Sequence, residues 1–138
     1  MKLGLKLEYA CRAILRLASC YDGQRVCRVE DLAAQEGISA NFLVQILNDL
    51  RRDGLVASRR GKLGGYTLAR PPEEINLADV TRAIEGGVLE IDRAESREGF
   101  GPVVTRVWRE EGRHLEQRLA QRTLAGLTAG STGLDYTI

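Results

Sequence analysis

Apolar residues recur at every third or fourth position in several stretches of the chain, and this is the spacing of amphipathic helices. The first stretch covers residues 7–21 and is followed by the turn residues Asp22 and Gly23. Its apolar positions are Leu7, Cys11, Ile14, Leu15, Ala18 and Tyr21. Residues 26–29 contain two valines and favour a brief strand. The chain is therefore predicted to begin with one helix and one short extended segment.

A tight turn joins the next two predicted helices. The first covers residues 30–36 and ends at Gly37, because glycine readily adopts the left-handed conformation that closes a helix. Ile38 is expected to anchor the turn in the core, and Ser39 is a good N-cap for a helix over residues 40–53. The apolar face of that helix is formed by Phe42, Leu43, Ile46, Leu47 and Leu50. This order predicts a helix-turn-helix with its recognition helix second.

A glycine-rich hairpin is predicted after the recognition helix. Residues 55–60 and 66–69 favour strands, and residues 61–65 contain three glycines that suit a hairpin tip. A fourth helix follows and is closed by Gly86 and Gly87. Its apolar face comprises Leu77, Val80, Thr81 and Ile84. Helix-turn-helix followed by a two-stranded hairpin is the order of a winged helix.

The last part of the chain is predicted to be a loop and a long helix. Residues 90–101 are polar, and the helix runs from Pro102 to about Arg122, followed by a short helix over residues 123–129 and a tail. The apolar stripe of the long helix consists of Val104, Trp108, Leu115 and Leu119. The predicted fold is therefore mainly α with a small β-hairpin wing. The predicted organisation has three parts. They are a winged helix-turn-helix DNA-binding domain over residues 1–87, a loop over residues 88–101, and a dimerisation helix with a C-terminal tail over residues 102–138.

Positive charge is concentrated on the predicted recognition helix and wing. The whole chain has a formal net charge of +1, whereas the segment from Arg51 to Arg70 holds six cations and one anion. Such a focus is typical of binding to a phosphate backbone. The predicted phosphate contacts are Arg51, Arg59, Arg60 and Lys62. Winged helices also serve as protein-interaction modules, so a protein-docking domain that binds no DNA is the alternative.

The recognition helix offers amide side chains for reading bases. Asn41, Gln45 and Asn48 lie opposite its apolar face, and Asn and Gln can bond adenine through two hydrogen bonds in the major groove. Ser39 caps the helix and is also expected to reach a phosphate. Double-stranded DNA is therefore the predicted partner.

Several motifs resemble the IscR/NsrR/CymR family of winged-helix regulators, the Rrf-two family. They are the helix-turn-helix, the Arg-Gly-x-x-Gly-Gly-Tyr wing from Arg60 to Tyr66, and the Ala-Arg-Pro-Pro exit from Ala69 to Pro72. The match is close over residues 1–87. The resemblance implies a homodimeric regulator, mostly a repressor, whose long C-terminal helix crosses to the partner and which reads a pseudo-palindromic operator. The same apolar stripe could instead pack within one protomer.

The chain departs from the family pattern in the segment where many members ligate an iron–sulfur cluster. Residues 85–112 contain no cysteine and no histidine, and the only histidine is His114. Because a cluster needs thiolate or imidazole ligands, no cluster and no other cofactor or metal is expected. The chain resembles the cluster-free, CymR-like branch. That branch implies control of cysteine and sulfur metabolism, with regulation by a partner protein or by thiol oxidation.

A second departure lies in the recognition helix. Where the family usually has Leu-Glu-Gln, this chain has Val44 in place of the glutamate. A carboxylate can accept a hydrogen bond from a cytosine amino group and valine cannot, so we expect a shifted base preference.

The three cysteines all lie within the first 27 residues. Cys11 is on the apolar stripe and is expected to pack in the core. Cys20 lies nine residues further on and on the opposite face, which excludes a disulfide between these two while the helix is intact. Cys20 and Cys27 are the candidates for redox sensing, and Arg25 and Arg28 are expected to lower the pKa of Cys27.

Other function classes find little support in the sequence. No apolar run approaches the ~20 residues that span a bilayer, and charged residues interrupt the N-terminal apolar segment. The expectation is a cytoplasmic protein with no membrane partner.

Residues 61–65 lack the Gly-Lys-Ser/Thr ending of a phosphate-binding loop and open no helix, so they are interpreted as the wing tip. No catalytic motif is present, and no enzyme is expected.

Overall fold

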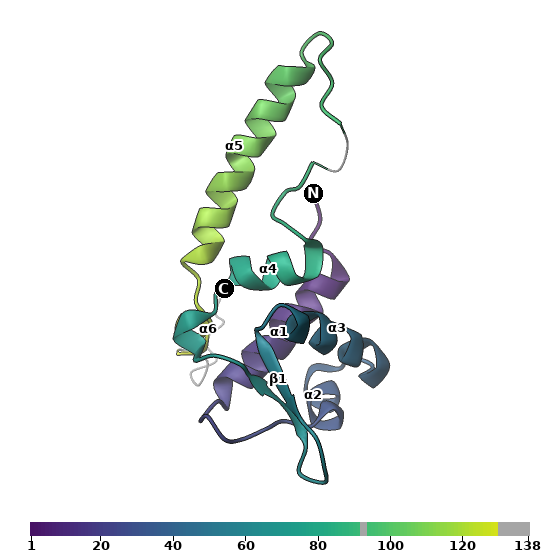
Figure 1. Cartoon of the computed structure of the whole chain (residues 1–138), viewed down its shortest axis with the longest axis vertical. Helices are drawn as coiled ribbons and strands as arrows, with labels where there is room; N and C mark the ends of the chain where they lie inside the picture. The colour runs from purple at the N-terminus through teal and green to yellow at the C-terminus, as the bar shows by residue number, and fades with distance from the viewer. Residues whose placement is uncertain (92–93, 130–138) are drawn as a thin grey trace.

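A computed structural model of the chain describes residues 1–91 and 94–129. It contains a globular body and one long helix that projects from it (Figure 1). The elements of the body, in chain order, are α1 (Leu5–Ser19), α2 (Val29–Glu36), α3 (Ala40–Arg52), β1 (Val56–Arg59), β2 (Gly65–Leu68), the short 3-10 helix η1 (Pro72–Glu74) and α4 (Leu77–Glu85). Helices α5 (Gly101–Ala120) and α6 (Leu124–Thr128) follow. The part of the predicted tail after residue 129 lies outside the described residues.

Helix α1 begins and ends two residues earlier than the apolar pattern predicted. Gly4 has the extended backbone of an N-cap, and its carbonyl accepts from the amide of Glu8 at 3.0 Å. Cys20 leaves the helical conformation at φ −117° and ψ 19°, so the helix stops at Ser19. Tyr21 therefore packs against the core from the loop rather than from the helix.

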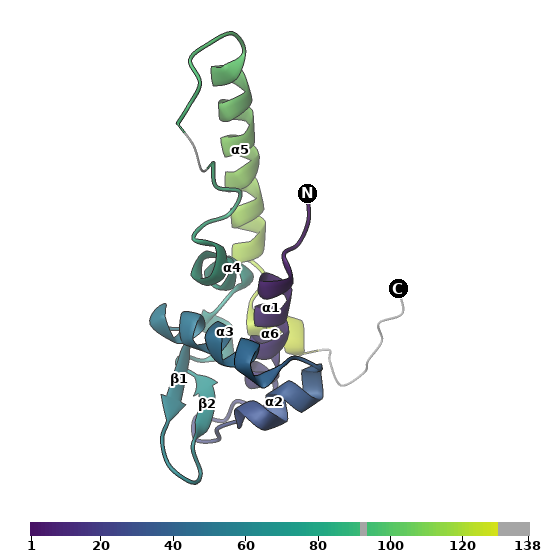
Figure 2. The same cartoon turned by 90° about the vertical axis from the view of Figure 1, so that its right-hand side faces the viewer.

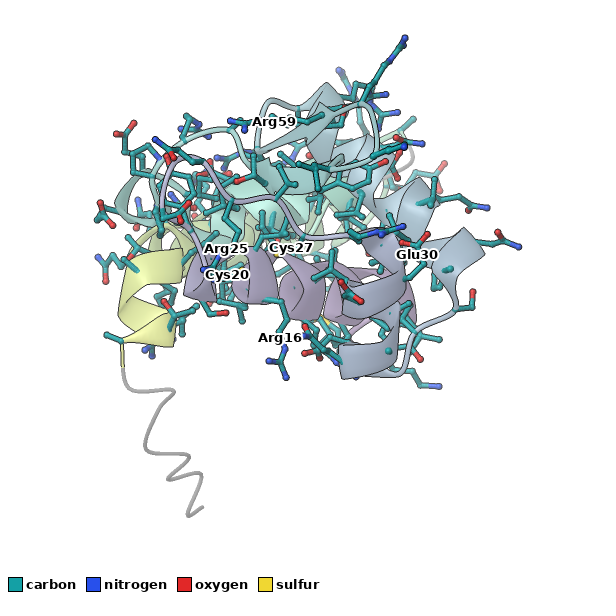
Figure 3. All side chains as sticks on the ribbon, turned by 90° about the horizontal axis from the view of Figure 1, so that it is seen from below. Arg16, Cys20, Arg25, Cys27, Glu30 and Arg59 are labelled. Carbon is teal, nitrogen blue, oxygen red and sulfur yellow. The ribbon has the colours of Figure 1, made fainter. Side chains whose placement is uncertain are left out.

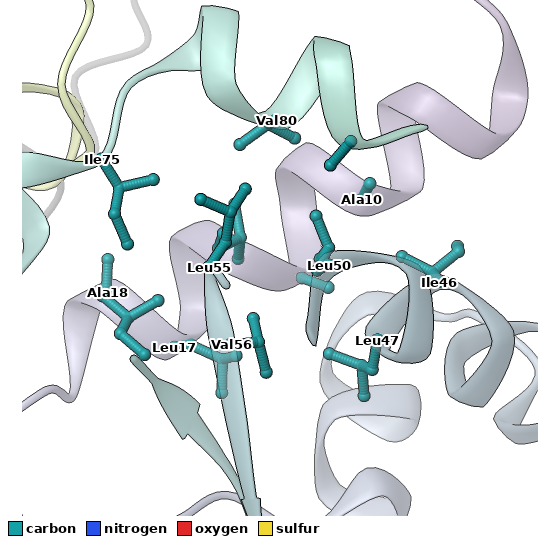
Figure 4. Close-up of a cluster of buried hydrophobic side chains, with 14 of the residues drawn as sticks. Ala10, Leu17, Ala18, Ile46, Leu47, Leu50, Leu55, Val56, Ile75 and Val80 are labelled. Atoms are coloured by element: carbon teal, nitrogen blue, oxygen red, sulfur yellow. The ribbon is translucent and has the colours of Figure 1, made fainter. Parts of the chain in front are cut away.

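The core lies between α1, α3, α4 and the start of the wing (Figure 4). Its residues include the predicted apolar faces of α1, α3 and α4, whereas the predicted stripe of α5 contributes none. The largest side chains with no more than 2% exposure are Ile14, Leu17, Leu32, Leu43, Ile46, Leu47, Leu50, Val56, Ile75, Val80 and Leu124. Burial of these side chains is the main favourable contribution to folding of the body.

The wing is a two-stranded antiparallel sheet in which Val56 pairs with Leu68 and Arg59 with Gly65. The brief strand expected over residues 26–29 is reduced to a single bridge between Cys27 and Tyr66, because Val29 already begins α2. The segment before α2 thus lies along the wing and forms a third, one-residue edge.

Helix α4 is closed at both ends by local signals. Asn76 and Asp79 form a reciprocal capping box, with both hydrogen bonds at 3.0 Å, and Gly86 ends the helix in the left-handed conformation at φ 86°. After α5 the chain returns to the body, where Leu124 donates its amide to the carbonyl of Ile75 at 2.9 Å. Helix α6 therefore belongs to the same packed body as α1 (Figure 2).

Candidate nucleic-acid interface

Helix α3 has one wholly buried face and one polar face. Its apolar residues Leu43, Ile46, Leu47 and Leu50 have no exposed surface. Asn41, Gln45 and Asn48 are spaced at i, i+4 and i+7, share the opposite face and are all exposed. The structure therefore brings the three predicted base-reading residues together on one accessible row. Val44 is half-buried beside them.

The turn before α3 has the geometry that its residue types predict. Gly37 adopts the left-handed conformation at φ 67°, and the amide of Ile38 donates to the carbonyl of Ala33 at 3.1 Å. Ile38 is 4% exposed and so anchors the turn. The hydroxyl of Ser39 accepts from the amide of Phe42 at 3.2 Å, which confirms the predicted N-cap.

Glu36, the last residue of α2, ties this turn to α1. Its carboxylate accepts from Nε of Arg12 at 3.0 Å and from Nε of Arg16, and its main-chain carbonyl accepts from Nη2 of Arg12. Burial acts to raise the pKa of Glu36, but the hydrogen bonds from Arg16 and Arg12 outweigh it and hold that pKa below its ordinary value. Sequence reasoning missed this contact. The available signal was a pair of arginines four residues apart on one face of the first helix.

The wing tip is shaped by glycines at two positions. Gly61 has φ 106°, and a Cβ on Gly64 would lie 2.4 Å from the carbonyl oxygen of Arg59. Leu63, which the sequence analysis did not single out, is 89% exposed at this tip. The tip is thus a narrow loop whose largest apolar side chain points into solvent.

The four predicted phosphate-binding cations are all exposed, and they fall into two groups. Arg51 donates to the hydroxyl of Ser58 at 3.4 Å, which joins the end of α3 to β1, and Arg59 donates to the main-chain carbonyl of Gln24 at 3.0 Å. Within residues 1–91 and 94–129, Arg60 and Lys62 form no ion pair or side-chain hydrogen bond. Their charges are therefore available to an anionic partner.

The structure corrects the sequence-based interpretation of Cys27. Burial raises the pKa of Cys27 to about 12, with a further increase from the hydrogen bond to Cys20, and the lowering by Arg25 is too small to reverse this. The prediction of a lowered pKa is therefore wrong, because it counted nearby charge and not desolvation. Cys11 packs against the core as predicted, and burial followed by the charge of Glu8 raises its pKa to about 11.

The two redox candidates lie in direct contact. Sγ of Cys20 is 3.1 Å from Sγ of Cys27, and Figure 3 shows the two side chains next to each other. The sequence analysis named both residues and did not predict that they meet. Their contact depends on the path of the loop between them, which periodicity does not report.

The apolar stripe of α5 is exposed in the protomer. Val104 is 53% exposed, Trp108 47% and Leu115 36%, and Leu119 is half-buried. The alternative that the stripe packs within one protomer is not what the structure shows. The helix is held on a different side, where Glu116 pairs with Arg82 of α4 at 2.7 Å and the buried Gly112 lies against Leu89.

The described residues offer no cluster of three or more His, Cys, Asp or Glu side chains placed to hold a metal ion. Among the same residues, no helix combines the length and apolarity needed to cross a membrane.

Comparison with known proteins gives the family. Residues 3–130 match the Rrf2 family, described as an iron-dependent transcriptional regulator. The chain belongs to the Rrf2 family. A transcriptional regulator of the HTH type from Mycobacterium tuberculosis is 42% identical over 135 residues, which cover 95% of this chain and 83% of that protein.

Solved structures of Rrf2 proteins agree with this fold. CymR of Bacillus subtilis, described as the global cysteine regulator, superposes with a TM-score of 0.78 at 28% identity, covering 94% of this chain and 97% of CymR. IscR of T. potens also gives a TM-score of 0.78, at 31% identity, covering 98% of this chain and 91% of IscR. These matches establish a transcriptional regulator of the Rrf2 family with the winged-helix fold.

Proposed function

We propose that this Rrf2 protein is a homodimeric repressor that binds a pseudo-palindromic operator through α3 and the wing. The observation that carries the proposal is the row of Asn41, Gln45 and Asn48 on a capped helix whose other face is fully buried. Exposed amides on a rigid helix suit base edges in the major groove, where Asn and Gln form paired hydrogen bonds to adenine.

The cations next to this row would hold the helix in register. Arg51 extends from the end of α3, while Arg59, Arg60 and Lys62 extend from the wing. Contacts to phosphate position a protein on the duplex and carry no sequence information, so these four residues supply affinity and the amides supply specificity. Ser39, at the N-terminus of α3, is placed to add a phosphate contact. Val44 would shift the base preference by offering an apolar surface to a thymine methyl group.

In the proposed dimer, the second protomer binds through the exposed stripe of α5. An exposed stripe containing Trp108, on a helix of 20 residues that projects from the body, matches the apolar surface that pairs of helices bury on association. A twofold dimer would place two α3 helices about 34 Å apart, one turn of B-DNA.

The family description names iron, and the donor set of this chain does not fit an iron–sulfur cluster. Residues 85–112 offer neither cysteine nor histidine, and Cys20 and Cys27 provide only two adjacent thiols. We therefore propose regulation without a cluster. Similarity to CymR, described as the global cysteine regulator, supports cysteine and sulfur metabolism as the regulated process. A partner protein or thiol oxidation is the proposed signal.

Selection of genomic fragments by the purified reduced protein at about 150 mM salt tests the proposal. An enriched inverted repeat, bound with an affinity that falls steeply as salt rises, is the expected result. A reporter gene behind that repeat should be expressed less when the protein is present. A folded dimer that enriches no fragment at any salt concentration would favour the alternative, a winged helix that binds only protein.

A further inference from the structure

The chain between Cys20 and Cys27 reverses direction through a turn held by Asp22. The carboxylate of Asp22 accepts from the amide of Gln24 at 2.9 Å and from the amide of Arg25 at 2.6 Å. This turn brings together two cysteines that are seven residues apart in sequence, with 3.1 Å between their sulfur atoms. The backbone turn between the two cysteines therefore favours the contact between their sulfur atoms.

We propose that Cys20 and Cys27 form an oxidation site at which a hydroperoxide produces an intramolecular disulfide, and that this disulfide weakens operator binding. The second half of the proposal rests on the DNA-binding function proposed above. The first half, formation of the disulfide, concerns only the two thiols and does not depend on DNA binding.

The reaction balances with the hydroperoxide as the oxidant. The thiolate of one cysteine attacks the peroxide oxygen, the O–O bond breaks, and a sulfenic acid and an alcohol form. The second cysteine then attacks the sulfenic sulfur, the S–S bond forms, the S–O bond breaks, and the hydroxyl leaves as water with the remaining thiol proton. Two thiols are oxidised by two electrons, and one hydroperoxide is reduced to an alcohol and water.

The surroundings of the two sulfur atoms assign their order of attack. Burial raises the pKa of Cys27 to about 12, so this thiol is protonated at neutral pH and is a poor first nucleophile. Cys20 is therefore the residue that attacks the peroxide, and Cys27 is the resolving residue already in contact with it.

The backbone of Cys27 is bonded directly to the wing. Its amide donates to the carbonyl of Tyr66 at 2.7 Å, and the amide of Tyr66 donates to the carbonyl of Cys27 at 2.8 Å. Gln24, in the same loop, accepts from Arg59 of β1 at 3.0 Å. Figure 3 shows this loop beside the strand that carries Arg59. A displacement of the loop is thus transmitted to both wing strands.

Closing the disulfide brings the two sulfur atoms closer together. A disulfide bond is about 2.05 Å long, so the sulfur atoms must approach by about 1 Å from their present separation. Cys20 caps the C-terminus of α1, two residues after the buried Ala18, whereas Cys27 lies in the loop before α2. The proposal assigns this movement to Cys27 and, through its hydrogen bonds to Tyr66, to the wing, where it would shift the cations that face phosphate.

The first experiment treats the full-length protein with hydrogen peroxide, blocks remaining thiols and digests it with trypsin. Cleavage after Arg25 separates the two cysteines into peptides 17–25 and 26–28, while Cys11 lies in peptide 7–12. The expected product is peptide 17–25 joined to peptide 26–28. The product should form in the matched control Cys11→Ala and be absent from Cys20→Ser and Cys27→Ser. The proposal would be overturned if the only oxidation product found were a sulfinic acid, or if the only disulfide found joined two separate chains.

The second experiment measures operator affinity of the reduced and oxidised protein at fixed salt. Oxidation should weaken wild type and Cys11→Ala by roughly fivefold or more, the usual lower range of coupling between two sites. Cys27→Ser should bind like reduced wild type and should not respond to peroxide, which also shows that it is folded. An unchanged affinity of a fully oxidised sample would overturn the regulatory half. If the reduced protein binds no DNA, the proposed function fails, while the peptide result still decides on the disulfide.

Discussion

Arg12 of α1 and Glu36 of α2 are joined by a 3.0 Å hydrogen bond from Nε to Oε1, directly before the turn that leads into α3. Arg16 bonds the same carboxylate from the next turn of α1. This arrangement fixes the start of the recognition helix relative to the first helix of the chain. The orientation of the predicted base-reading row therefore depends on a charged contact as well as on the apolar core.

Glu36→Gln should lower the melting temperature by a few degrees at neutral pH, because the amide keeps the shape and loses the charge. The pKa of Glu36 is depressed in the folded state. Its contribution to the free energy of unfolding is therefore present above the unfolded-state pKa and is lost as pH falls through the folded-state pKa. The difference between wild type and variant should accordingly shrink in acid. Thermal unfolding from pH 7 to about pH 3 measures it.

Glu30→Gln is the matched control for Glu36→Gln. Glu30 is also on α2, but its side chain is 71% exposed and pairs with Arg28 only at 3.7 Å. Its substitution should leave the melting temperature almost unchanged at every pH, since exposed pairs contribute little. Equal effects of the two substitutions would show that Glu36 contributes nothing beyond general surface charge.

Arg60→Ala should weaken operator binding and reduce the salt dependence by about one phosphate contact per protomer, with little change in sequence preference. Arg97→Ala removes the same charge from the segment before α5, at the opposite end of the molecule from the wing. The control should retain both the affinity and the slope of log affinity against log salt. If Arg60→Ala retained them too, the wing would not contact DNA.

Trp108→Glu should convert the proposed dimer into a monomer, because it places a charge in the apolar stripe of α5. Sedimentation equilibrium measures the mass directly. Gln117→Glu introduces the same side chain nine residues further along, half a rotation around the helix, at an exposed polar position. That control should remain dimeric. A dimeric Trp108→Glu protein with unchanged circular dichroism would place the interface elsewhere.

Gly65→Ala should destabilise the body by about 1–3 kcal/mol, the usual cost of overpacking. An added Cβ would lie 2.5 Å from the carbonyl oxygen of Cys27, so the wing and the loop before α2 must separate. Hydrogen exchange at the amides of Cys27 and Tyr66 should accelerate. Gly4→Ala, where the nearest atom would be 3.5 Å away, should change neither stability nor exchange.

Local sequence signals were enough to predict the turn and the cap of α3. The left-handed Gly37 and the accepting hydroxyl of Ser39 both depend on residues close in sequence, and both predictions were confirmed. The contact of Cys20 with Cys27 was not predictable in the same way. It depends on a loop path that Asp22 fixes through main-chain hydrogen bonds, and on the pairing of Cys27 with a strand almost 40 positions later.

The pKa of Cys27 shows a second limit of reasoning from neighbours in sequence. Adjacent arginines suggested a lowered pKa, and burial against Cys20 produces the opposite. Desolvation is set by tertiary packing, which a list of nearby charges does not contain. The exposed row of Asn41, Gln45 and Asn48 was predictable because helical periodicity alone places these residues opposite the apolar face.

The return of the chain to the body after α5 changes what counts as an independent folding unit. Leu124 has no exposed surface, and the amide of Leu77 donates to the carbonyl of Arg122 at 3.0 Å. A fragment cut after residue 87 would therefore leave a hole in its core where Leu124 belongs. The smallest self-contained piece is therefore discontinuous in sequence: it comprises the winged-helix body and the segment that returns to it after α5.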